Sequence, residues 1–337
     1  MSETLTSECS QQSDRVKTTV IDRVLLRQVS PKDAKWDDRR AESDRATELY
    51  TGTKYSGLAA RIGGCAGRLE FGFDIGDDGK SKYTLQRAWF CRVRTCPVCQ
   101  WRRSLMWRAK TIKILPKVVE DNPRHRFIFL TLTVRNCELT NLRETVGMMT
   151  AAWGRLTKRK NWPAHGWIRS LEVTRSHDGT AHPHFHCLLM VPAGYFKGKN
   201  YLSQQAWTDL WKDVLRIEYQ PMVNIKAVKQ KKGTNQTIVE AILETIKYTV
   251  KPDDLVGTDK EVLETDREWL VELTTQLHNV RALATGGVLK EYLKELEQEP
   301  EDLIHVDDGS EEDSLTIATV TFDWETNPKK YLMRTDD

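Results

Sequence analysis

Three histidines at alternating positions are the part of this sequence best suited to chemistry: His182, His184 and His186. Side chains two apart on a β-strand point to the same face, so His184 and His186 are expected to project together. Phe185 then points into the opposite layer. Two imidazoles on one face suit a divalent metal ion, and packing alone rarely explains such a pair within a strand. The pattern predicts a metal site.

A catalytic metal needs a further protein ligand, and the preceding strand offers Glu172. Facing residues of an antiparallel pair have a constant index sum, so Glu172 faces His184 if the sum is 356 and His186 if it is 358. A tight two-residue turn would give 357, and Glu172 would then face the residue between the two histidines. The metal site therefore requires an odd-length loop or a β-bulge, for example at Pro183.

A second candidate group lies on residues 235–251, which have helical periodicity and are followed by Pro252. On a helical projection Glu244, Tyr248 and Lys251 form one polar stripe opposite an apolar face. The stripe suits phosphoryl transfer, in which the phenol attacks, a cation holds the phosphate and the carboxylate activates water. An ordinary solvated helix face would look the same, so the stripe alone does not assign a function.

Four cysteines have the spacing of a structural zinc site. Cys91, Cys96 and Cys99 crowd into nine residues, and Cys65 lies upstream. The alternative is a chance grouping of buried thiols. The chain has seven cysteines and no apolar leader segment, which favours reduced thiols and a cytoplasmic protein.

The segment that follows the cysteines is basic and contains aromatic residues. Residues 92–113 include seven basic side chains and no acidic one, interleaved with two tryptophans. This composition suits contacts with the phosphates and bases of DNA. Six residues are predicted to make them: Arg92, Arg94, Trp101, Arg102, Arg103 and Arg108. The alternative is that the tryptophans belong to the core and the arginines are merely solvated.

The overall charge supports a polyanionic partner. Of 337 residues, 39% are hydrophobic and 29% charged, and no run of eighteen apolar residues predicts a membrane span. The net charge of +3 hides an asymmetry. Residues 291–337 carry 15 acidic and 4 basic side chains, which leaves 47 basic and 33 acidic before them. A basic body with an acidic tail favours nucleic acid as the partner.

The elements that must position these residues follow the order β-α-β-β-α-β-α. Strands are predicted at 126–134, 166–175, 183–191 and 222–229, and helices at 138–158, around Trp207 and Trp211, and at 235–251. This order predicts an α+β fold of the ferredoxin-like kind, an antiparallel sheet with helices packed on one face. Later elements are predicted as helices at 263–284 and 288–297 and a short strand at 315–322.

Together the motifs resemble the HUH endonucleases, and specifically the Rep initiators of small rolling-circle plasmids. The resemblance spans about residues 50–289. It rests on the strand motif from Phe129 to Thr133, the histidine motif, the cysteine motif with its Gln-Trp-Arg-Arg extension, Glu-x-x-Lys-Tyr-x-x-Lys from Glu244 to Lys251, and Gly286-Gly287-Val288. No second tyrosine lies near Glu244, so the resemblance is to the single-tyrosine branch.

The resemblance implies that a tyrosine nicks one strand at the plasmid origin, forming a 5′-phosphotyrosine and freeing a 3′-OH primer. It implies these roles: Tyr248 as the nucleophile, His184, His186 and Glu172 as ligands of Mg²⁺ or Mn²⁺, Lys251 as a supporting cation, and Glu244 as the group that activates water at termination. The implied partners are origin DNA, single-stranded at the nick, and a host DNA polymerase and helicase.

The same reading divides the chain into five parts. They are a flexible extension (1–49), a cysteine-rich zinc and DNA-binding region (50–120), an HUH nuclease domain or palm (121–255), C-terminal helices (256–299) and an acidic, mostly disordered tail (300–337). Two other functions fit the same residues. One is a relaxase or single-tyrosine transposase with the same chemistry, and the other is a non-catalytic, zinc-dependent DNA-binding regulator.

Overall fold

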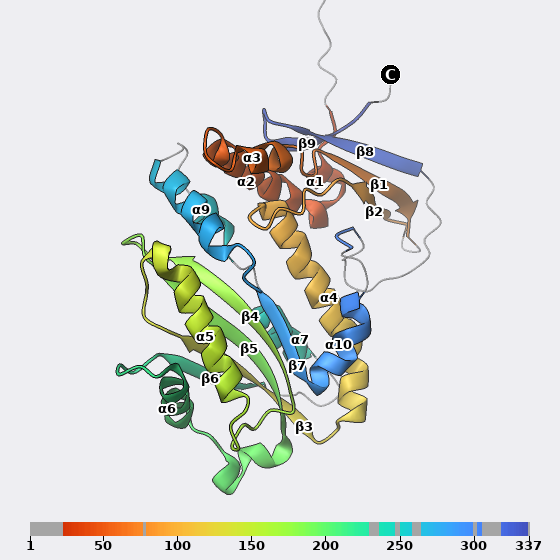
Figure 1. Ribbon diagram of the computed structural model, residues 1–337. Helices are drawn as coiled ribbons and strands as arrows, with labels where there is room; N and C mark the ends of the chain where they lie inside the picture. The colour runs from red at the N-terminus through yellow and green to blue at the C-terminus, as the bar shows by residue number, and fades with distance from the viewer. Residues whose placement is uncertain are drawn as a thin grey trace, which may run out of the picture.

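The computed structural model describes residues 23–76, 79–228, 236–246, 250–257, 264–298, 302–304 and 318–335. Two antiparallel sheets lie at opposite ends of the molecule, and the long helix α4 (Pro97–Asp121) runs between them (Figure 1). Among the residues described, no helix is both long enough and apolar enough to cross a membrane.

The larger sheet has the order β6-β3-β5-β4-β7, and all its neighbours are antiparallel. Its strands are β3 (His125–Thr133), β4 (Gly166–Arg175), β5 (Ala181–Pro192), β6 (Val223–Val228) and β7 (Leu283–Gly287). The four predicted strands occur close to their predicted bounds, in the order β6-β3-β5-β4 of a split-βαβ arrangement. The sequence therefore predicts the α+β class and the order of these four strands.

The fifth strand, β7, was not predicted. The helix expected over residues 263–284 ends earlier, as α9 (Glu264–Leu277), and the chain then pairs with the edge of β4. Gly286 lies directly beside Trp167, where a Cβ atom would come within 2.3 Å of the indole. The glycine thus permits a close approach of backbone and ring, which a helix assignment does not anticipate.

Helices cover both faces of this sheet, so the expectation of helices on one face is wrong. Helices α5 (Leu142–Leu156) and α6 (Gln204–Leu215) pack on the face that presents Phe185, whose ring meets Trp153 and Trp211. On the opposite face α7 (Gln236–Thr245), α10 (Val288–Gln298) and the second half of α4 enclose a separate core around Leu188 and Met190 (Figure 1). Strand β5 is central and buried on both sides, which requires two covering layers.

The smaller sheet joins the two ends of the chain. Its order is β2-β1-β8-β9, with strands β1 (Arg68–Ile75), β2 (Ser81–Ala88), β8 (Ala318–Glu325) and β9 (Lys330–Met333). The short strand predicted at 315–322 therefore exists over 318–322, continues to Glu325 and pairs with β1, whereas 315–317 lie outside the described residues. Phe322 is fully buried against Phe71. Residues 318–335 are ordered by this pairing. The expectation of a disordered tail, which excepted the strand at 315–322, is therefore wrong for residues 323–335.

The N-terminal extension also differs from expectation over residues 23–49. This segment forms α1 (Leu26–Val29), the 3₁₀ turn Pro31–Asp33 and most of α2 (Lys35–Tyr50), followed by α3 (Ser56–Gly63). Trp36 in α2 is fully buried and its ring contacts Trp101 and Tyr331. The helix has few apolar residues, so its weak periodicity concealed a core element whose partners come from distant segments. The rest of the predicted extension, residues 1–22, lies outside the described residues.

The remaining elements are short. They are the 3₁₀ turns Leu139–Asn141, Ala193–Phe196 and Gly198–Asn200, and the helix α8 (Pro252–Val256).

Candidate functional site

The hairpin of β4 and β5 brings the predicted metal ligands together. A five-residue loop, 176–180, joins the strands and is closed by a hydrogen bond from the Gly179 N–H to the Ser176 carbonyl. In the resulting register Glu172 faces His184, with an index sum of 356. The odd-length loop is confirmed, and no bulge is needed at Pro183, which pairs in the regular register.

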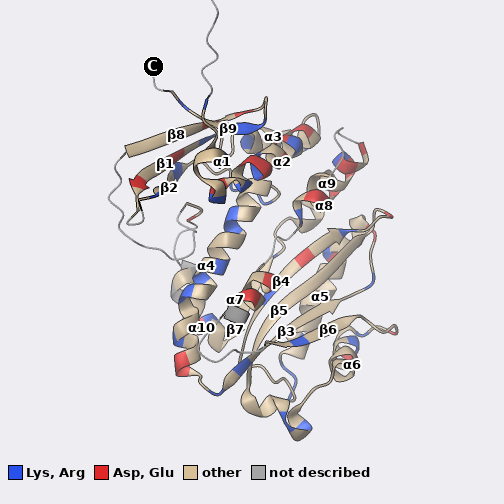
Figure 2. Ribbon diagram, turned by 180° about the vertical axis from the view of Figure 1, so that it is seen from behind, with Lys and Arg blue, Asp and Glu red and all other residues tan. Residues whose placement is uncertain are grey.

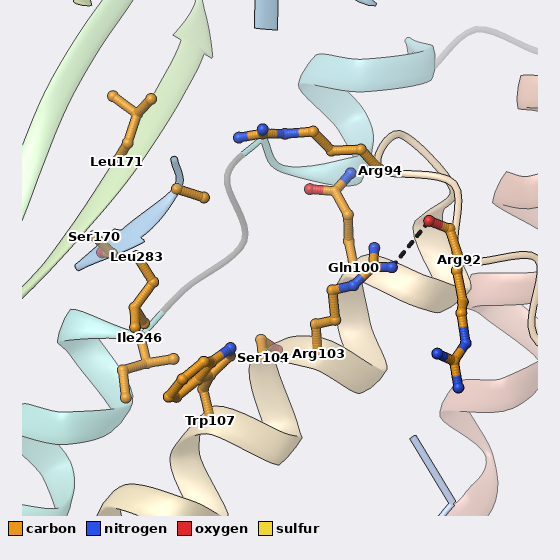
Figure 3. Close-up of a pocket in the computed structure, with 11 residues that line it drawn as sticks. Arg92, Arg94, Gln100, Arg103, Ser104, Trp107, Ser170, Leu171, Ile246 and Leu283 are labelled. Atoms are coloured by element: carbon orange, nitrogen blue, oxygen red, sulfur yellow. Dashed lines mark hydrogen bonds between the residues drawn. The ribbon is translucent and has the colours of Figure 1, made fainter. Parts of the chain in front are cut away.

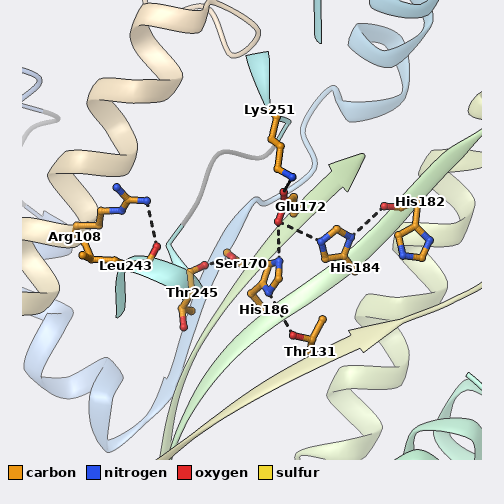
Figure 4. Close-up of polar contacts among 10 residues, drawn as sticks. All are labelled: Arg108, Thr131, Ser170, Glu172, His182, His184, His186, Leu243, Thr245 and Lys251. Carbon is orange, nitrogen blue, oxygen red and sulfur yellow. Dashed lines mark hydrogen bonds and ion pairs between the residues drawn. The ribbon is translucent and has the colours of Figure 1, made fainter. Parts of the chain in front are cut away.

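Glu172 contacts both histidines on one face of the sheet (Figure 4). Its Oε2 atom lies 3.2 Å from Nε2 of His184 and 2.7 Å from Nε2 of His186. The three residues are at most 9% exposed. Burial alone would raise the pKa of Glu172, but the hydrogen bonds and charges of His184 and His186 lower it well below its usual range. The carboxylate is thus held ionised.

The surroundings of the histidines prepare their Nε2 atoms for a metal. Nδ1 of His184 lies 3.2 Å from the carbonyl oxygen of His182, and donation from Nδ1–H to this carbonyl would leave Nε2 available to a metal in place of its hydrogen bond with Glu172. Nδ1 of His186 lies 3.5 Å from the hydroxyl of Thr131. The ligand atoms of the three residues lie within 4.8 Å of one another. Two imidazoles and one carboxylate can bind Mg²⁺ or Mn²⁺ and leave positions open for phosphate and water.

His182 does not share this arrangement. It is half-buried, and its Nδ1 lies 2.8 Å from the side-chain oxygen of Asn136. The motif therefore contributes two candidate ligands, and its first histidine contributes a carbonyl that orients one of them.

The long helix predicted over 235–251 is wrong at Ile246, Val250 and Lys251, and 247–249 lie outside the described residues. Helix α7 ends at Thr245, and Lys251 has extended backbone angles just before α8. Pro252 begins α8 rather than ending a helix, because proline is well suited to the first helical turn. Lys251 is therefore not on the helix that carries Glu244. It still reaches the predicted site, with Nζ 3.7 Å from Oε1 of Glu172.

Tyr248 lies outside the described residues, but the chain on both sides of it is held near the metal-binding triad of Glu172, His184 and His186. On the N-terminal side, the Ser170 hydroxyl donates to the Thr245 carbonyl and Nε of Arg108 donates to the Ile246 carbonyl at 2.8 Å. Ser170 is paired with His186 in the sheet. On the C-terminal side, Val250 is buried, followed by Lys251 at Glu172. Glu244 is exposed on α7.

The four predicted zinc ligands converge at the start of α4. Cys65 follows α3, Cys91 follows β2, Cys96 caps α4 and Cys99 lies in its first turn. All are buried, and Sγ of Cys99 lies 3.5 Å from Sγ of Cys65 and 3.6 Å from that of Cys91. Sulfur atoms around tetrahedral zinc, with bonds of ~2.3 Å, would be separated by roughly 3.8 Å.

The electrostatics of this cysteine cluster also fit a cation. Its hydrogen bonds, first that with Cys91, raise the pKa of the Cys65 thiol far above its usual range. Adjacent thiolates repel one another, so four can ionise together only around a positive ion. The donor set and its geometry therefore suit structural zinc.

The structure divides the six predicted DNA-contact residues into three groups. Trp101 and Arg102 are buried, at 7% and 1% exposure, and Arg102 donates to the carbonyls of Leu303 and Ile304 at 2.7 Å. The prediction is wrong for these two, because they tie α4 to a distant segment. Arg108 instead binds the carbonyls at the end of α7.

The remaining three, Arg92, Arg94 and Arg103, lie beside a cavity near the start of α4. Lys and Arg residues recur along this helix (Figure 2). Sequence reasoning placed Trp107 in the basic segment but did not select it, although it lines the same cavity.

Comparisons with known proteins point to a single family. A family model described as "Replication protein" matches residues 82–332. The chain is 34% identical over 319 residues to "Protein rep" of Lentilactobacillus hilgardii, covering 92% of this chain and 98% of that protein. It is 33% identical over 323 residues to "Protein rep" of Streptococcus pneumoniae serotype 2 (strain D39 / NCTC 7466), covering 93% and 96%. A "Replication protein" of Staphylococcus aureus is 33% identical over 232 residues, covering 66% and 96%. No solved structure matches significantly.

The cysteine cluster predicts about one tightly held zinc ion per chain, measurable by elemental analysis of the purified protein. Cys96→Ser should lose the zinc and lower the thermal unfolding temperature, because a structural metal contributes folding free energy directly. Cys137→Ser is the matched control, since Cys137 is only partly buried and lies outside the cluster. A native protein without zinc and with four titratable thiols would contradict the assignment.

The triad predicts a divalent-metal site separate from the zinc. His184→Ala, His186→Ala and Glu172→Ala should each weaken Mn²⁺ binding, measured by calorimetry on the zinc-loaded protein, by at least 10-fold. The control is His182→Ala, whose imidazole lies outside the triad and whose carbonyl is retained. Wild-type Mn²⁺ affinity in the Glu172 variant would remove that residue from the ligand set.

Proposed function

Because this chain belongs to the replication-protein family, we propose that it initiates the rolling-circle replication of a plasmid by nicking one DNA strand at the origin. The proposal assigns the larger sheet and its helices as an HUH nuclease palm. Its central support is that one carboxylate, Glu172, contacts both His184 and His186. Lys251, which follows Tyr248 in the sequence, also lies close to this carboxylate. The segment that contains the proposed nucleophile is therefore held near the metal-binding triad by the described residues that precede it and follow it.

In the proposed reaction the phenol oxygen of Tyr248 attacks the scissile phosphorus. The bond from phosphorus to the 3′-oxygen breaks, the phenol loses its proton, and the departing 3′-oxygen gains one. The products are a 5′-phosphotyrosine and a free 3′-OH that primes synthesis. Glu172, His184 and His186 would hold a divalent ion here, and its Lewis acidity would make the phosphate reactive toward a phenol with an ordinary pKa near ~10.

The chain's own groups position this reaction. The triad is buried against the sheet, so its ligand atoms are fixed before DNA arrives, which lowers the entropic cost of alignment. Lys251 is about half exposed and lies on the solvent side of Glu172, where its ammonium can hold a phosphate oxygen. Burial of Glu172 with both imidazoles keeps it anionic and suited to a divalent cation.

Termination requires a second attack, which we assign to water activated by Glu244. Its position is on the last turn of α7, whose end is fixed to Ser170 and Arg108. Its solvent exposure is consistent with a group that must receive a proton from water. Origin DNA, single-stranded at the nick, is the proposed substrate, and host polymerase and helicase are the proposed partners.

A relaxase or a single-tyrosine transposase would use the same groups, and a zinc-dependent DNA-binding regulator would use the cysteine cluster alone. The family match and the extent of the relatives' coverage favour the replication function over the first two. Covalent attachment of the protein to single-stranded DNA separates the enzyme from the regulator.

The experiment that tests the proposal is incubation with labelled single-stranded oligonucleotides tiled across the plasmid that carries this gene, scored for covalent adducts. Tyr248→Phe should abolish adduct formation, below the detection limit, while DNA affinity changes less than 3-fold, because one hydroxyl is removed. Tyr201→Phe is the control, since Tyr201 is 54% exposed and lies outside the site. An adduct formed by the Tyr248 variant would show that another residue is the nucleophile.

Glu244→Ala should separate the two ends of the cycle. The first nick through Tyr248 should proceed, whereas hydrolysis at the second cleavage should fail and leave the protein attached to DNA. A scaffolding role predicts instead a modest and equal loss at both steps. Initiation and termination products from a plasmid with two origins, compared with those of Glu240→Ala one turn earlier on α7, distinguish these results.

A further inference from the structure

A cavity of about 280 Å³ lies between the first half of α4 and the β4–β7 edge of the larger sheet (Figure 3). Its α4 side includes Gln100, Arg103 and Trp107, and Arg94 reaches in from the loop before the helix. Its opposite wall includes Leu283 of β7 and the end of the α7 segment. The cavity is therefore formed jointly by the cysteine-rich region and the proposed nuclease region.

The described lining of the cavity is cationic and includes three arginines. The lining residues that the structure describes include no aspartate or glutamate. Nη1 of Arg94 donates to the Val280 carbonyl, whereas its Nη2 atom is buried with no hydrogen-bond partner in the described chain. Burial, and then repulsion from Arg103, lowers the pKa of Arg94 to about 10. A bound anion would relieve both effects.

The rest of the lining suits a planar base. The indole of Trp107 forms one wall, close to Ile246 and Leu283 (Figure 3). Oε1 of Gln100 is buried without a hydrogen-bond partner among the described residues, and it is an acceptor that an exocyclic amino group could satisfy. Arginine beside an aromatic wall is the combination that single-stranded nucleic acid uses, with phosphate at the cation and base on the ring.

The cavity adjoins the metal-binding triad. Ser170 is in its wall, pairs with His186 in the sheet, and lies two residues before Glu172 on the same strand face. Ile246, also in the wall, is two residues before Tyr248 in the sequence. A ligand here would be a near neighbour of the scissile phosphate.

We propose that this cavity holds one unpaired nucleotide of the strand being nicked, with its base against Trp107 and its phosphate at Arg94 and Arg103. The inference rests on the proposed function, because it takes the substrate to be single-stranded DNA. The volume lies at the lower limit of ligand pockets, which span ~300–1,000 Å³, and matches a single base better than a base pair. A free nucleotide has the same chemistry, so the test must separate it from a nucleotide within a strand.

The test measures equilibrium binding of the full-length, zinc-loaded protein without added divalent metal, so that no cleavage occurs. The probe is the tiled oligonucleotide that forms the adduct, or the tightest binder if none does, with a single abasic site at each position in turn. At one position near the nick, base removal should weaken wild-type binding about 5- to 150-fold, the range expected for one stacked base.

Trp107→Ala should weaken binding of intact DNA by a similar factor and lose its sensitivity to the abasic site at that position only. Trp107→Phe should keep both. Equal sensitivity in wild type and Trp107→Ala at every position would overturn the proposal. Because Trp107 also packs against apolar neighbours, Gln100→Ala provides a second measurement. It should reduce the preference for bases with an amino group over thymine at the same position, and an unchanged preference would count against the proposal.

The phosphate contact has a matched pair of variants. Arg94→Gln and Arg92→Gln remove the same charge, but the guanidinium of Arg92 points away from the other lining side chains (Figure 3). An abasic site keeps its phosphate, so Arg94→Gln should weaken binding of intact and abasic DNA alike, and by more than Arg92→Gln does. Equal losses in the two variants would overturn the phosphate contact. Competition by micromolar deoxynucleoside monophosphates would instead identify a free-nucleotide site and overturn the strand assignment. Adduct formation by the wild-type protein tests the proposed function independently of these outcomes.

Discussion

The register of one β-hairpin brings together the three residues of the candidate metal site, Glu172, His184 and His186. The five-residue loop between β4 and β5 places Glu172 opposite His184, and both histidines of the motif then contact the same carboxylate oxygen. Side chains alternate with a period of two, so a slip by one residue would turn Glu172 away from them. Strand β5 is buried on both faces, and a slip would also move the histidines into the layer that holds Phe185. Packing thus fixes the register that the chemistry needs.

Helix α4 links the cysteine cluster to that site. Cys96 and Cys99 hold its first turn, and twelve residues later, after about 18 Å of helix, Arg108 binds the carbonyl of Ile246. Further along, Leu115 enters the core beneath α7. A metal bound by the cysteines would therefore act on cleavage at a distance, because it fixes the start of a rigid helix whose side chains hold the end of α7. Helix α4 therefore connects the cysteine cluster rigidly to the end of α7.

How much the sequence could predict follows from the range of the interactions involved. The triad depends on a period of two within a hairpin, so the types and spacing of Glu172 and His184 predicted it on condition of an odd-length loop or a bulge, and the structure has the odd-length loop. Arg102 was assigned to DNA because its partners, carbonyls near Leu303, are 201 residues away and have no local signature. Strand β7 was missed, and β8 was predicted to end three residues too early, for the same reason, since each pairs with a distant strand. Lys251 was predicted on the helix of Glu244 because Pro252 was expected to end that helix. A proline can also begin a helix, and Pro252 begins α8.

The proposed nucleotide cavity is lined by residues that also make the hydrogen bonds holding the end of α7. Ser170 lines the cavity and donates to the Thr245 carbonyl, while Ile246 lines the cavity and accepts from Arg108. A base that packs against this wall adds contacts that exist only when the end of α7 is hydrogen-bonded to Ser170 and Arg108. By thermodynamic linkage, the attachment of α7 to Ser170 and Arg108 strengthens base binding, and base binding stabilises that attachment by the same free energy. Paired DNA cannot insert a base without the cost of unstacking and unpairing it. The shared wall would therefore favour alignment of the nucleophile when the strand at the nick is already unpaired, which confines cleavage to an opened origin.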